Sequence, residues 1–152
     1  MNFFLNKKVG VLGLSRTGIS SIKFLKKKGF SVFGWDDNKK ILSKVKKNKL
    51  NIKILNNSNL KKMSFLLTSP GIPYSGKKKH IILKKAEKEK VEILNDIELF
   101  FRFNPEEKYI GVTGTNGKST TVCLLSHVFE KLKINNSLSG NIGKPVFDLK
   151  KF

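Results

Sequence analysis

The sequence predicts an α/β fold, because two separate stretches share the order apolar strand, glycine-rich turn and helix. The first stretch begins with Lys8–Gly13 and turns through Gly13–Gly18. The second begins with Tyr109–Val112 and passes through Gly114–Ser119 into another helix-forming segment. Strands that alternate with helices build a parallel sheet covered by helices. We therefore expect a Rossmann-like parallel sheet domain over residues 1–104, followed by the beginning of a P-loop ATPase α/β domain over residues 105–152.

The first unit continues from its glycine turn into an amphipathic helix, whose inward positions recur at three-residue spacing: Ile19, Ile22 and Leu25. A second strand, Phe30–Trp35, ends in Asp36 and Asp37, where an acidic residue grips a ribose in dinucleotide-binding folds. The turn departs from the fingerprint G-x-G-x-x-G, because Ser15 replaces the glycine that lets the backbone approach a pyrophosphate. The pattern therefore favours a unit that holds some nucleotide, without specifying NAD.

The segments up to residue 104 continue the alternation. We expect a lysine-rich helical or irregular stretch at 39–49, strands at 50–55, 65–67 and 92–94, and helices at 81–90 and 95–101. Asn95 can cap the last helix, with Glu98 completing a capping box. Thr68–Pro73 is a turn that directly follows a strand, where loops of an open sheet hold ligands. Gly71 is either a substrate contact or part of a plain tight turn, and spacing alone does not decide between them.

The second glycine loop is the strongest chemical motif. Its glycines let backbone N–H groups converge on phosphate oxygens, and the next helix presents its positive end to the same anion. The expected ATP-binding residues are Gly114, Thr115, Asn116, Gly117, Lys118, Ser119 and Thr120. Lys118 would reach the β/γ-phosphates as the catalytic residue, and the Ser119 hydroxyl would ligate Mg²⁺. Val112 stands where the general pattern has its first glycine, and the alternative is a turn that merely joins a strand to a helix.

The helix after this loop has an expected inward stripe of Val122, Leu125, Val128, Phe129 and Leu132. A further strand is expected at 135–139, before a loop at 140–145. Cys123 is expected to be a small core residue, and Trp35 to pack at the end of its strand. Neither His80 nor His127 has a partner at metal-ligand spacing, so we assign neither to a metal.

Composition and charge narrow the function classes. The chain has 152 residues, 39% of them hydrophobic, which is enough for a packed core. We find no bilayer-length apolar run and no signal peptide, and the single cysteine suits a reducing cytosol, so we expect a cytoplasmic protein without a membrane partner. The net charge of +20 raises the alternative of nucleic-acid binding. Only Arg16 and Arg102 are arginines, however, and a compositional bias towards lysine explains the charge without a specific nucleic-acid partner.

Taken together, the motifs resemble the Mur ligase family, and most closely its D-glutamate-adding members. The matching stretches are Gly13–Gly18, Ser69–Ile72, Asn95–Phe100, Gly114–Thr120 and Gly140–Gly143, in the same order and at matching spacing along nearly all of the chain. The loop Gly114–Thr120 is shared by the wider family, including folylpolyglutamate synthetases. The stretches at 69–72 and 96–100 narrow the resemblance to the D-glutamate-adding branch.

The resemblance implies ATP-dependent peptide-bond formation in cytoplasmic peptidoglycan precursor synthesis. The implied partners are UDP-MurNAc-L-alanine, D-glutamate and ATP with Mg²⁺: ATP phosphorylates the substrate carboxylate, and the amine of D-glutamate attacks the acyl phosphate. Carried over, the UDP-substrate residues are Ser15, Arg16 and Thr17 at the phosphate-facing turn, Asp36 and Asp37 near the uridine, Gly71 near the diphosphate and Asn141 near the reacting end.

Family members are much longer, and the resemblance implies that their remaining Mg²⁺ ligand, carbamylated lysine and D-glutamate site lie beyond Phe152. We therefore expect this chain to be an N-terminal portion that is inactive alone and part of a monomer at full length. The alternative from another class is a Rossmann-type module that binds NAD or a UDP-sugar without ligase activity.

Overall fold

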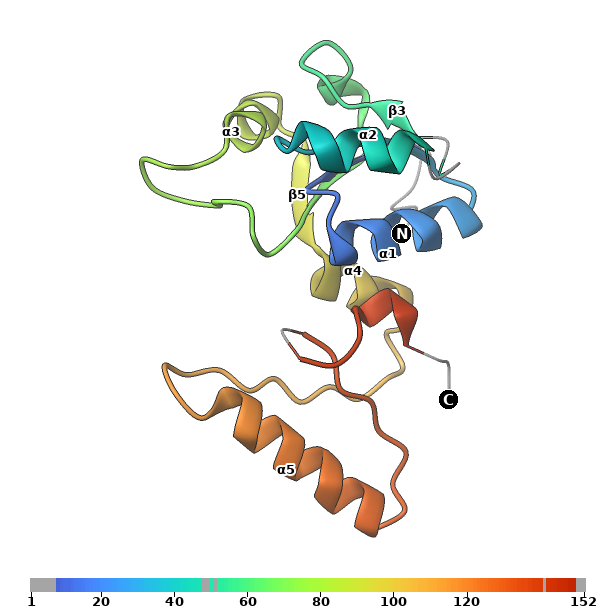
Figure 1. Cartoon of the computed structure of the whole chain (residues 1–152), viewed down its shortest axis with the longest axis vertical. Coiled ribbons are helices and arrows are strands. Elements are labelled where there is room, and N and C mark those ends of the chain that lie inside the picture. The colour runs from blue at the N-terminus through green and yellow to red at the C-terminus, as the bar shows by residue number, and fades with distance from the viewer. Residues whose placement is uncertain (1–7, 48–49, 51, 141, 150–152) are drawn as a thin grey trace.

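The computed structural model describes residues 8–47, 50, 52–140 and 142–149. Its centre is a five-stranded parallel sheet in the order β3-β2-β1-β4-β5 (Figure 1). The strands are β1 (Lys8–Leu12), β2 (Ser31–Trp35), β3 (Lys53–Ile54), β4 (Phe65–Thr68) and β5 (Glu92–Asn95). The helices are α1 (Arg16–Lys27), α2 (Lys39–Lys47), α3 (Ile81–Lys88), α4 (Asp96–Phe103) and α5 (Lys118–Lys131), with 3₁₀ turns η1 (Leu60–Lys62) and η2 (Val146–Asp148). The expected α/β, Rossmann-like fold is confirmed.

The central strand β1 pairs with β2 on one side and with β4 on the other. The chain builds the sheet outward from β1 through β2 to β3, and then returns to the other side of β1 for β4 and β5. The direction of winding therefore reverses between β1 and β4. In open parallel sheets, ligands bind at the carboxyl end of such a reversal. The expected third strand is shorter than predicted, because only Lys53–Ile54 pairs with β2.

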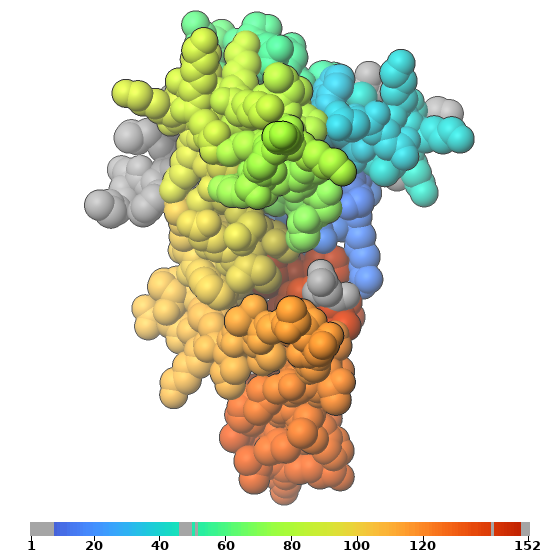
Figure 2. Space-filling view, turned by 90° about the vertical axis from the view of Figure 1, so that its left-hand side faces the viewer, coloured from blue at the N-terminus to red at the C-terminus, as the bar shows by residue number. Residues whose placement is uncertain are grey.

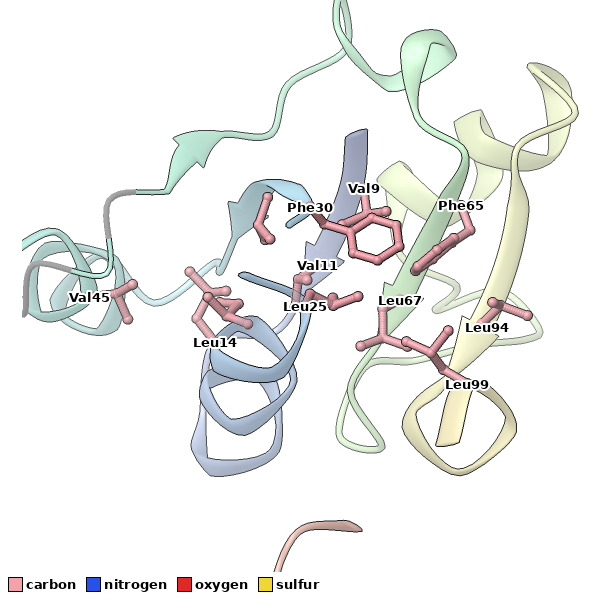
Figure 3. Packing of buried hydrophobic residues seen from close by; sticks show 12 residues of the cluster. Val9, Val11, Leu14, Leu25, Phe30, Val45, Phe65, Leu67, Leu94 and Leu99 are labelled. Carbon is pink, nitrogen blue, oxygen red and sulfur yellow. The ribbon is translucent and has the colours of Figure 1, made fainter. Parts of the chain in front are cut away.

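Each face of the sheet carries its own apolar cluster, because successive side chains of a strand point to opposite faces. Val9 and Val11 pack with Leu25 of α1 and Leu99 of α4 on one face, as Figure 3 shows. Leu12 belongs to the second cluster, on the other face, which contains the buried residues Ile82, Leu83 and Ala86 of α3. Trp35 packs against this second cluster at the end of β2, as expected.

The chain beyond α4 departs from the expected strands and helix packing. Residues 109–113 and 135–138 form no strand in the structure, and the second region has only a single bridge between Ser139 and Lys144. Isolated strands are unstable without neighbours to accept their backbone hydrogen bonds, and none of the five sheet strands pairs with these segments. Both strand predictions are therefore wrong for this chain.

The predicted inward stripe of α5 is also wrong, because no residue of this helix is buried. Val128 is 42% exposed and Leu132 is 63% exposed, and Cys123, expected in a core, is exposed as well. The helix lies away from the sheet and forms a narrow end of the molecule (Figures 1 and 2). An apolar stripe predicts which face of a helix would be buried, but not whether this chain supplies the partner. Among the described residues, no helix is long and apolar enough to span a membrane.

The last described turn returns to the sheet domain. Val146 of η2 is 4% exposed, and the Phe147 ring stacks on the Phe24 ring of α1 with centroids 4.3 Å apart. The Ser20 hydroxyl of α1 donates to the Asp148 carboxylate at 2.7 Å. Residues 146–148 are therefore packed on α1 although they lie far from it in the sequence.

The predicted cap of helix α4 by Asn95 is confirmed, but the predicted capping box is wrong, because Glu98 pairs with Arg102 instead. The Asn95 side chain accepts the Glu98 N–H at 2.8 Å, whereas the Glu98 carboxylate accepts from the Arg102 guanidinium at 2.9 Å. Asp96, the first residue of the helix, is 7% exposed. Burial disfavours the charged form and raises the pKa of the Asp96 carboxyl above its usual value of 3.8, against hydrogen bonds from the backbone N–H groups of Ile97 and Asp96 that lower it.

We expect Gly18→Ala to destabilise the sheet domain by about 3 kcal/mol or more, because the added Cβ would meet backbone that cannot move aside. A Cβ at Gly18 would lie 1.9 Å from the carbonyl oxygen of Gly13. The matched control is Gly71→Ala, where a Cβ meets nothing within 4 Å and the change should stay within about 0.5 kcal/mol. Urea unfolding followed by circular dichroism measures both. Equal stability of the two variants would show that α1 does not pack on the turn as described.

We expect Asp96→Asn to alter the pH dependence of stability. Because the folded pKa of Asp96 is raised, the unfolded chain loses this proton first as the pH rises above 3.8, and the folded state becomes less favoured until the pH passes the raised pKa. Between pH 3.8 and the raised pKa, the free energy of unfolding of the variant should therefore increase relative to that of the unmodified chain. Urea titrations at a series of pH values give the difference, and a difference that does not change with pH would contradict the burial effect.

Candidate nucleotide-binding sites

The turn after β1 is held by contacts that leave no room for side chains. Gly13 has a φ of +89°, in the left-handed region that favours glycine. A Cβ on it would lie 2.8 Å from the Cβ of Ser69. The buried Ser69 hydroxyl donates to the Gly13 carbonyl oxygen at 2.9 Å, and Gly18 packs against the same carbonyl. The loops after β1 and β4 therefore touch at the point where the winding of the sheet reverses.

The three predicted phosphate-facing residues lie at the start of α1. Ser15 is the N-cap residue, but its side chain makes no capping hydrogen bond, and no acidic residue lies in the first turn. The first N–H groups and the positive end of α1 thus face the carboxyl edge of the sheet, an arrangement suited to an anion. Arg16 extends from this turn and donates from Nη2 to the Gly143 carbonyl oxygen at 3.2 Å. Thr17 is half-buried beside it.

Asp36 follows β2 and is tied to the glycine turn. Its Oδ2 accepts the Leu14 N–H at 2.7 Å, and its Oδ1 accepts the Asn38 N–H at 2.8 Å. The carboxylate therefore fixes the position of the β1 turn relative to β2. Since each carboxylate oxygen has two lone pairs, Asp36 retains acceptor capacity for a ligand N–H or O–H group.

Asp37 contacts two aromatic side chains. Its Oδ1 accepts from Trp35 Nε1 at 2.9 Å, and His80 Nε2 lies 3.0 Å from its Oδ2. The hydrogen bond from Trp35 is the largest cause that lowers the pKa of the Asp37 carboxyl from its usual value of 3.8; burial opposes it, and the contact with His80 lowers the pKa further. His80 was predicted not to bind a metal, and its contact with Asp37, 43 positions away, was not predicted.

Gly71 lies exposed in the loop after β4, within a turn closed by the Ile72 N–H to the Ser69 carbonyl oxygen at 3.0 Å. Its φ lies outside the left-handed region, and a Cβ at this position meets nothing within 4 Å. Contacts within the described residues therefore do not require glycine here. The Thr68 hydroxyl, just before this loop, is buried without a hydrogen-bond partner among the described residues, and such groups are usually satisfied by ordered water or a ligand.

The second glycine loop keeps the geometry of a helix start. Gly117, with a φ of +76°, is the N-cap residue of α5, and its carbonyl oxygen accepts the Thr121 N–H at 2.9 Å. Lys118 Nζ folds back over the loop to the carbonyl oxygens of Gly114 and Thr115, the latter at 3.1 Å. Residues 114–120 are all exposed. The lysine ammonium thus already points towards the loop that would surround a phosphate.

The donor set around this loop fits a nucleotide phosphate and supplies part of a magnesium site. The Ser119 and Thr120 hydroxyls are exposed on the first turn of α5. Within residues 8–47, 50, 52–140 and 142–149, no group of three or more His, Cys, Asp or Glu side chains is placed to hold a metal ion. Mg²⁺ commonly combines few protein ligands with substrate phosphates and water. From this chain Ser119 could therefore contribute one ligand.

Six of the seven residues predicted for the UDP substrate follow the carboxyl ends of β1, β2 and β4. Ser15, Arg16 and Thr17 lie at the N-cap and first turn of α1, Asp36 and Asp37 follow β2, and Gly71 lies in the loop after β4. The seventh, Asn141, lies outside the described residues. The predicted ATP residues 114–120 form a second group at the start of α5. Ser69 and His80 are additional residues of the first group.

Three relatives match this chain over 99% of its length. A UDP-N-acetylmuramoylalanine–D-glutamate ligase of Wolbachia pipientis wMel is 38% identical, with 30% of its own length covered. Ligases of the same name from Bartonella henselae and Rickettsia prowazekii are 34% and 35% identical, with 34% and 33% covered. The chain therefore spans about a third of the length of the relatives it matches.

An imine reductase from Myxococcus stipitatus, in complex with NAD+, superposes with a TM-score of 0.47 and 12% identity over 85% of this chain and 63% of its own. We draw no conclusion from so low a likeness. The model of the family described as "Mur ligase MurD-like, N-terminal domain" matches residues 7–95, more than half of the chain. The chain belongs to the Mur ligase MurD-like N-terminal domain family.

Proposed function

We propose that this chain is the N-terminal part of an ATP-dependent ligase that adds D-glutamate to UDP-MurNAc-L-alanine in cytoplasmic peptidoglycan precursor synthesis. The single observation that carries the proposal is the match of 99% of the chain to relatives named UDP-N-acetylmuramoylalanine–D-glutamate ligase. The site geometry supports it, because two separate glycine turns each precede a helix whose N-terminus can bind an anion. Such a ligase needs two nucleotide sites, one for the UDP substrate and one for ATP.

In this proposal residues 1–104 bind the UDP substrate at the carboxyl edge of the sheet. The first turn of α1, with Ser15, Arg16 and Thr17, would face the diphosphate, and Gly71 would lie near the diphosphate as well. Asp36 and Asp37 lie near the uridine, where a carboxylate can accept an N–H or O–H group. Asn141 would lie near the reacting end of the substrate.

Residues 105–152 begin the ATP-binding domain. Lys118 is the proposed catalytic residue: its ammonium would leave the carbonyl oxygens of Gly114 and Thr115 and bind the β/γ-phosphate oxygens. There it would stabilise the charge that develops as the phosphoryl group moves to the substrate carboxylate. The other loop residues, Thr115, Asn116, Gly117 and Thr120 among them, hold the phosphates. Mg²⁺, when bound, would neutralise phosphate charge, with Ser119 as one of its ligands.

The proposed activity belongs to the complete ligase. We infer that this chain is inactive alone and that the full-length enzyme is a monomer. The exposed apolar residues of α5, including Leu124 at 62% and Leu132 at 63%, support a need for further protein around the ATP site. D-Glutamate would be bound by that further part.

We expect the chain to bind UDP-MurNAc-L-alanine at least about ten times more tightly than NAD. We also expect Arg16→Ala to weaken the binding of UDP-MurNAc-L-alanine by about tenfold or more, because charge-assisted hydrogen bonds to phosphate contribute about 1.5–3 kcal/mol. Isothermal titration calorimetry measures each affinity. Lys61→Ala is the matched control, since it removes one positive charge from the 3₁₀ turn η1, which precedes β4. A preference for NAD would overturn the assignment in favour of a dinucleotide-binding module.

For the second site we expect Lys118→Ala to weaken MgATP binding by about tenfold or more, for the same electrostatic reason. A fluorescent ATP analogue with Mg²⁺ reports the affinity by its change in anisotropy. Lys131→Ala removes the same charge from the last turn of the same helix and should leave this affinity unchanged. Equal affinity of the two variants would mean that Lys118 does not bind the phosphates.

A further inference from the structure

The connection between β4 and α3 is long for an α/β protein. It runs from Ser69 to His80, whereas such loops usually have about two to six residues. Its first residue is fixed by the hydrogen bond between the Ser69 hydroxyl and the Gly13 carbonyl oxygen. Gly71 is its third residue, in the turn that the Ile72 N–H closes, and the region from residue 73 to residue 78 is exposed. What fixes the far end of the loop therefore decides where the exposed region from residue 73 to residue 78 can lie.

The His80 ring fixes that far end through both of its nitrogen atoms. Nδ1 accepts the Ile82 N–H at 3.1 Å and so caps α3. A ring nitrogen that accepts a hydrogen bond carries no proton, so in the neutral ring Nε2 carries it. Nε2 then donates to the Asp37 carboxylate, 3.0 Å from Oδ2 and 3.2 Å from Oδ1. The His80 side chain is 9% exposed, which limits the ring to this orientation.

Asp37 is held from its other side by Trp35. The indole Nε1 donates to Asp37 Oδ1 at 2.9 Å, and the Trp35 ring packs against the second apolar cluster. Trp35, Asp37 and His80 thus form a continuous chain of contacts, which we call the β2–α3 clasp. Because β1 lies between β2 and β4 in the sheet, the clasp joins the two loops that flank the glycine turn.

We propose that His80 is a positioning residue, which holds the α3 end of the loop between β4 and α3 beside the glycine turn through its contact with Asp37. The proposal rests on the proposed function, since it concerns the pocket for the UDP substrate. A free loop loses conformational entropy when a ligand orders it, whereas a loop that is already held loses less. The Asp37 carboxylate, with hydrogen bonds from two side chains of this chain, contributes to substrate affinity chiefly through the clasp.

The variant His80→Asn separates the clasp from the cap. Asparagine is a good N-cap residue and keeps an acceptor for the Ile82 N–H, but its shorter side chain does not reach Asp37. Asp37→Ala removes the clasp from the other side, at a carboxylate whose side chain is 69% exposed and whose loss the fold should tolerate. Lys78→Ala, an exposed lysine of the same loop, is the matched control.

Two readouts test the clasp without any ligand. Trp35 is the only tryptophan, so its fluorescence emission reports on the contact with Asp37 and should shift in both clasp variants. Backbone amide hydrogen exchange over residues 70–80 should be several-fold faster in both, while unfolding by urea changes little in His80→Asn. Unchanged emission and exchange in the two variants would overturn the clasp, whatever the chain binds.

Calorimetric titration with UDP-MurNAc-L-alanine tests the positioning role. We expect His80→Asn and Asp37→Ala each to weaken binding by about fivefold, and the double variant to weaken it no more than the larger single effect, because both act through one contact. Full affinity in His80→Asn, together with faster loop exchange, would overturn the positioning role. Additive losses would also overturn it, since His80 and Asp37 would then act separately. Failure of the unmodified chain to bind UDP-MurNAc-L-alanine would overturn the proposed function, and the ligand-free readouts would still decide the clasp.

Discussion

The close packing of Gly18 on the Gly13 carbonyl is the constraint on which the proposed substrate site depends. The carbonyl oxygen is the nearest neighbour of the place where a Cβ would stand at Gly18, and it also accepts the Ser69 hydroxyl hydrogen bond. The Gly13 carbonyl group therefore contacts both the start of α1 and the loop after β4. The free N–H groups of α1 can face the carboxyl edge of the sheet only because no side chain separates the helix from this turn.

The fold of residues 8–103 could be predicted from the sequence because the signals for its elements are local. The strand patterns at β1, β2, β4 and β5 are short apolar runs, and each ends at a turn or helix signal that acts within a few residues. Asn95 capping α4 is such a signal. The segments at 109–112 and 135–139 carry similar strand patterns, but none of the strands in the described part of the chain pairs with them. Strand formation depends on pairing with distant segments, so a local pattern cannot establish that the partner exists.

In the candidate site, too, the features with local sequence signals could be predicted, whereas the contacts between distant residues could not. The glycine turn and the acidic pair after β2 follow from local spacing. The contact between His80 and Asp37 joins residues 43 positions apart, and that between Ser69 and Gly13 joins residues 56 positions apart. Neither has a periodic or short-range signature. The cap that His80 provides for α3 is local, however, and the position of a histidine directly before the helix could have indicated it.

The two proposed nucleotide sites differ in how far this chain completes them. At the first, the turn after β1 is tied by buried or half-buried groups to the residues after β2 and β4, so its shape is determined by the sheet itself. At the second, residues 114–120 are exposed, and α5 has no buried residue. Electrostatic stabilisation of a phosphoryl group depends on donors that are held in place and shielded from water. In the proposed ligase, Lys118, whose ammonium contacts carbonyl oxygens of its own loop, would recognise a phosphate but would become catalytic only once further protein covers α5 and fixes the loop. Under the proposed function, substrate recognition and phosphoryl transfer would therefore place different demands on this chain. The sheet domain would meet the first with its own contacts, whereas the second would depend on surfaces outside the described residues.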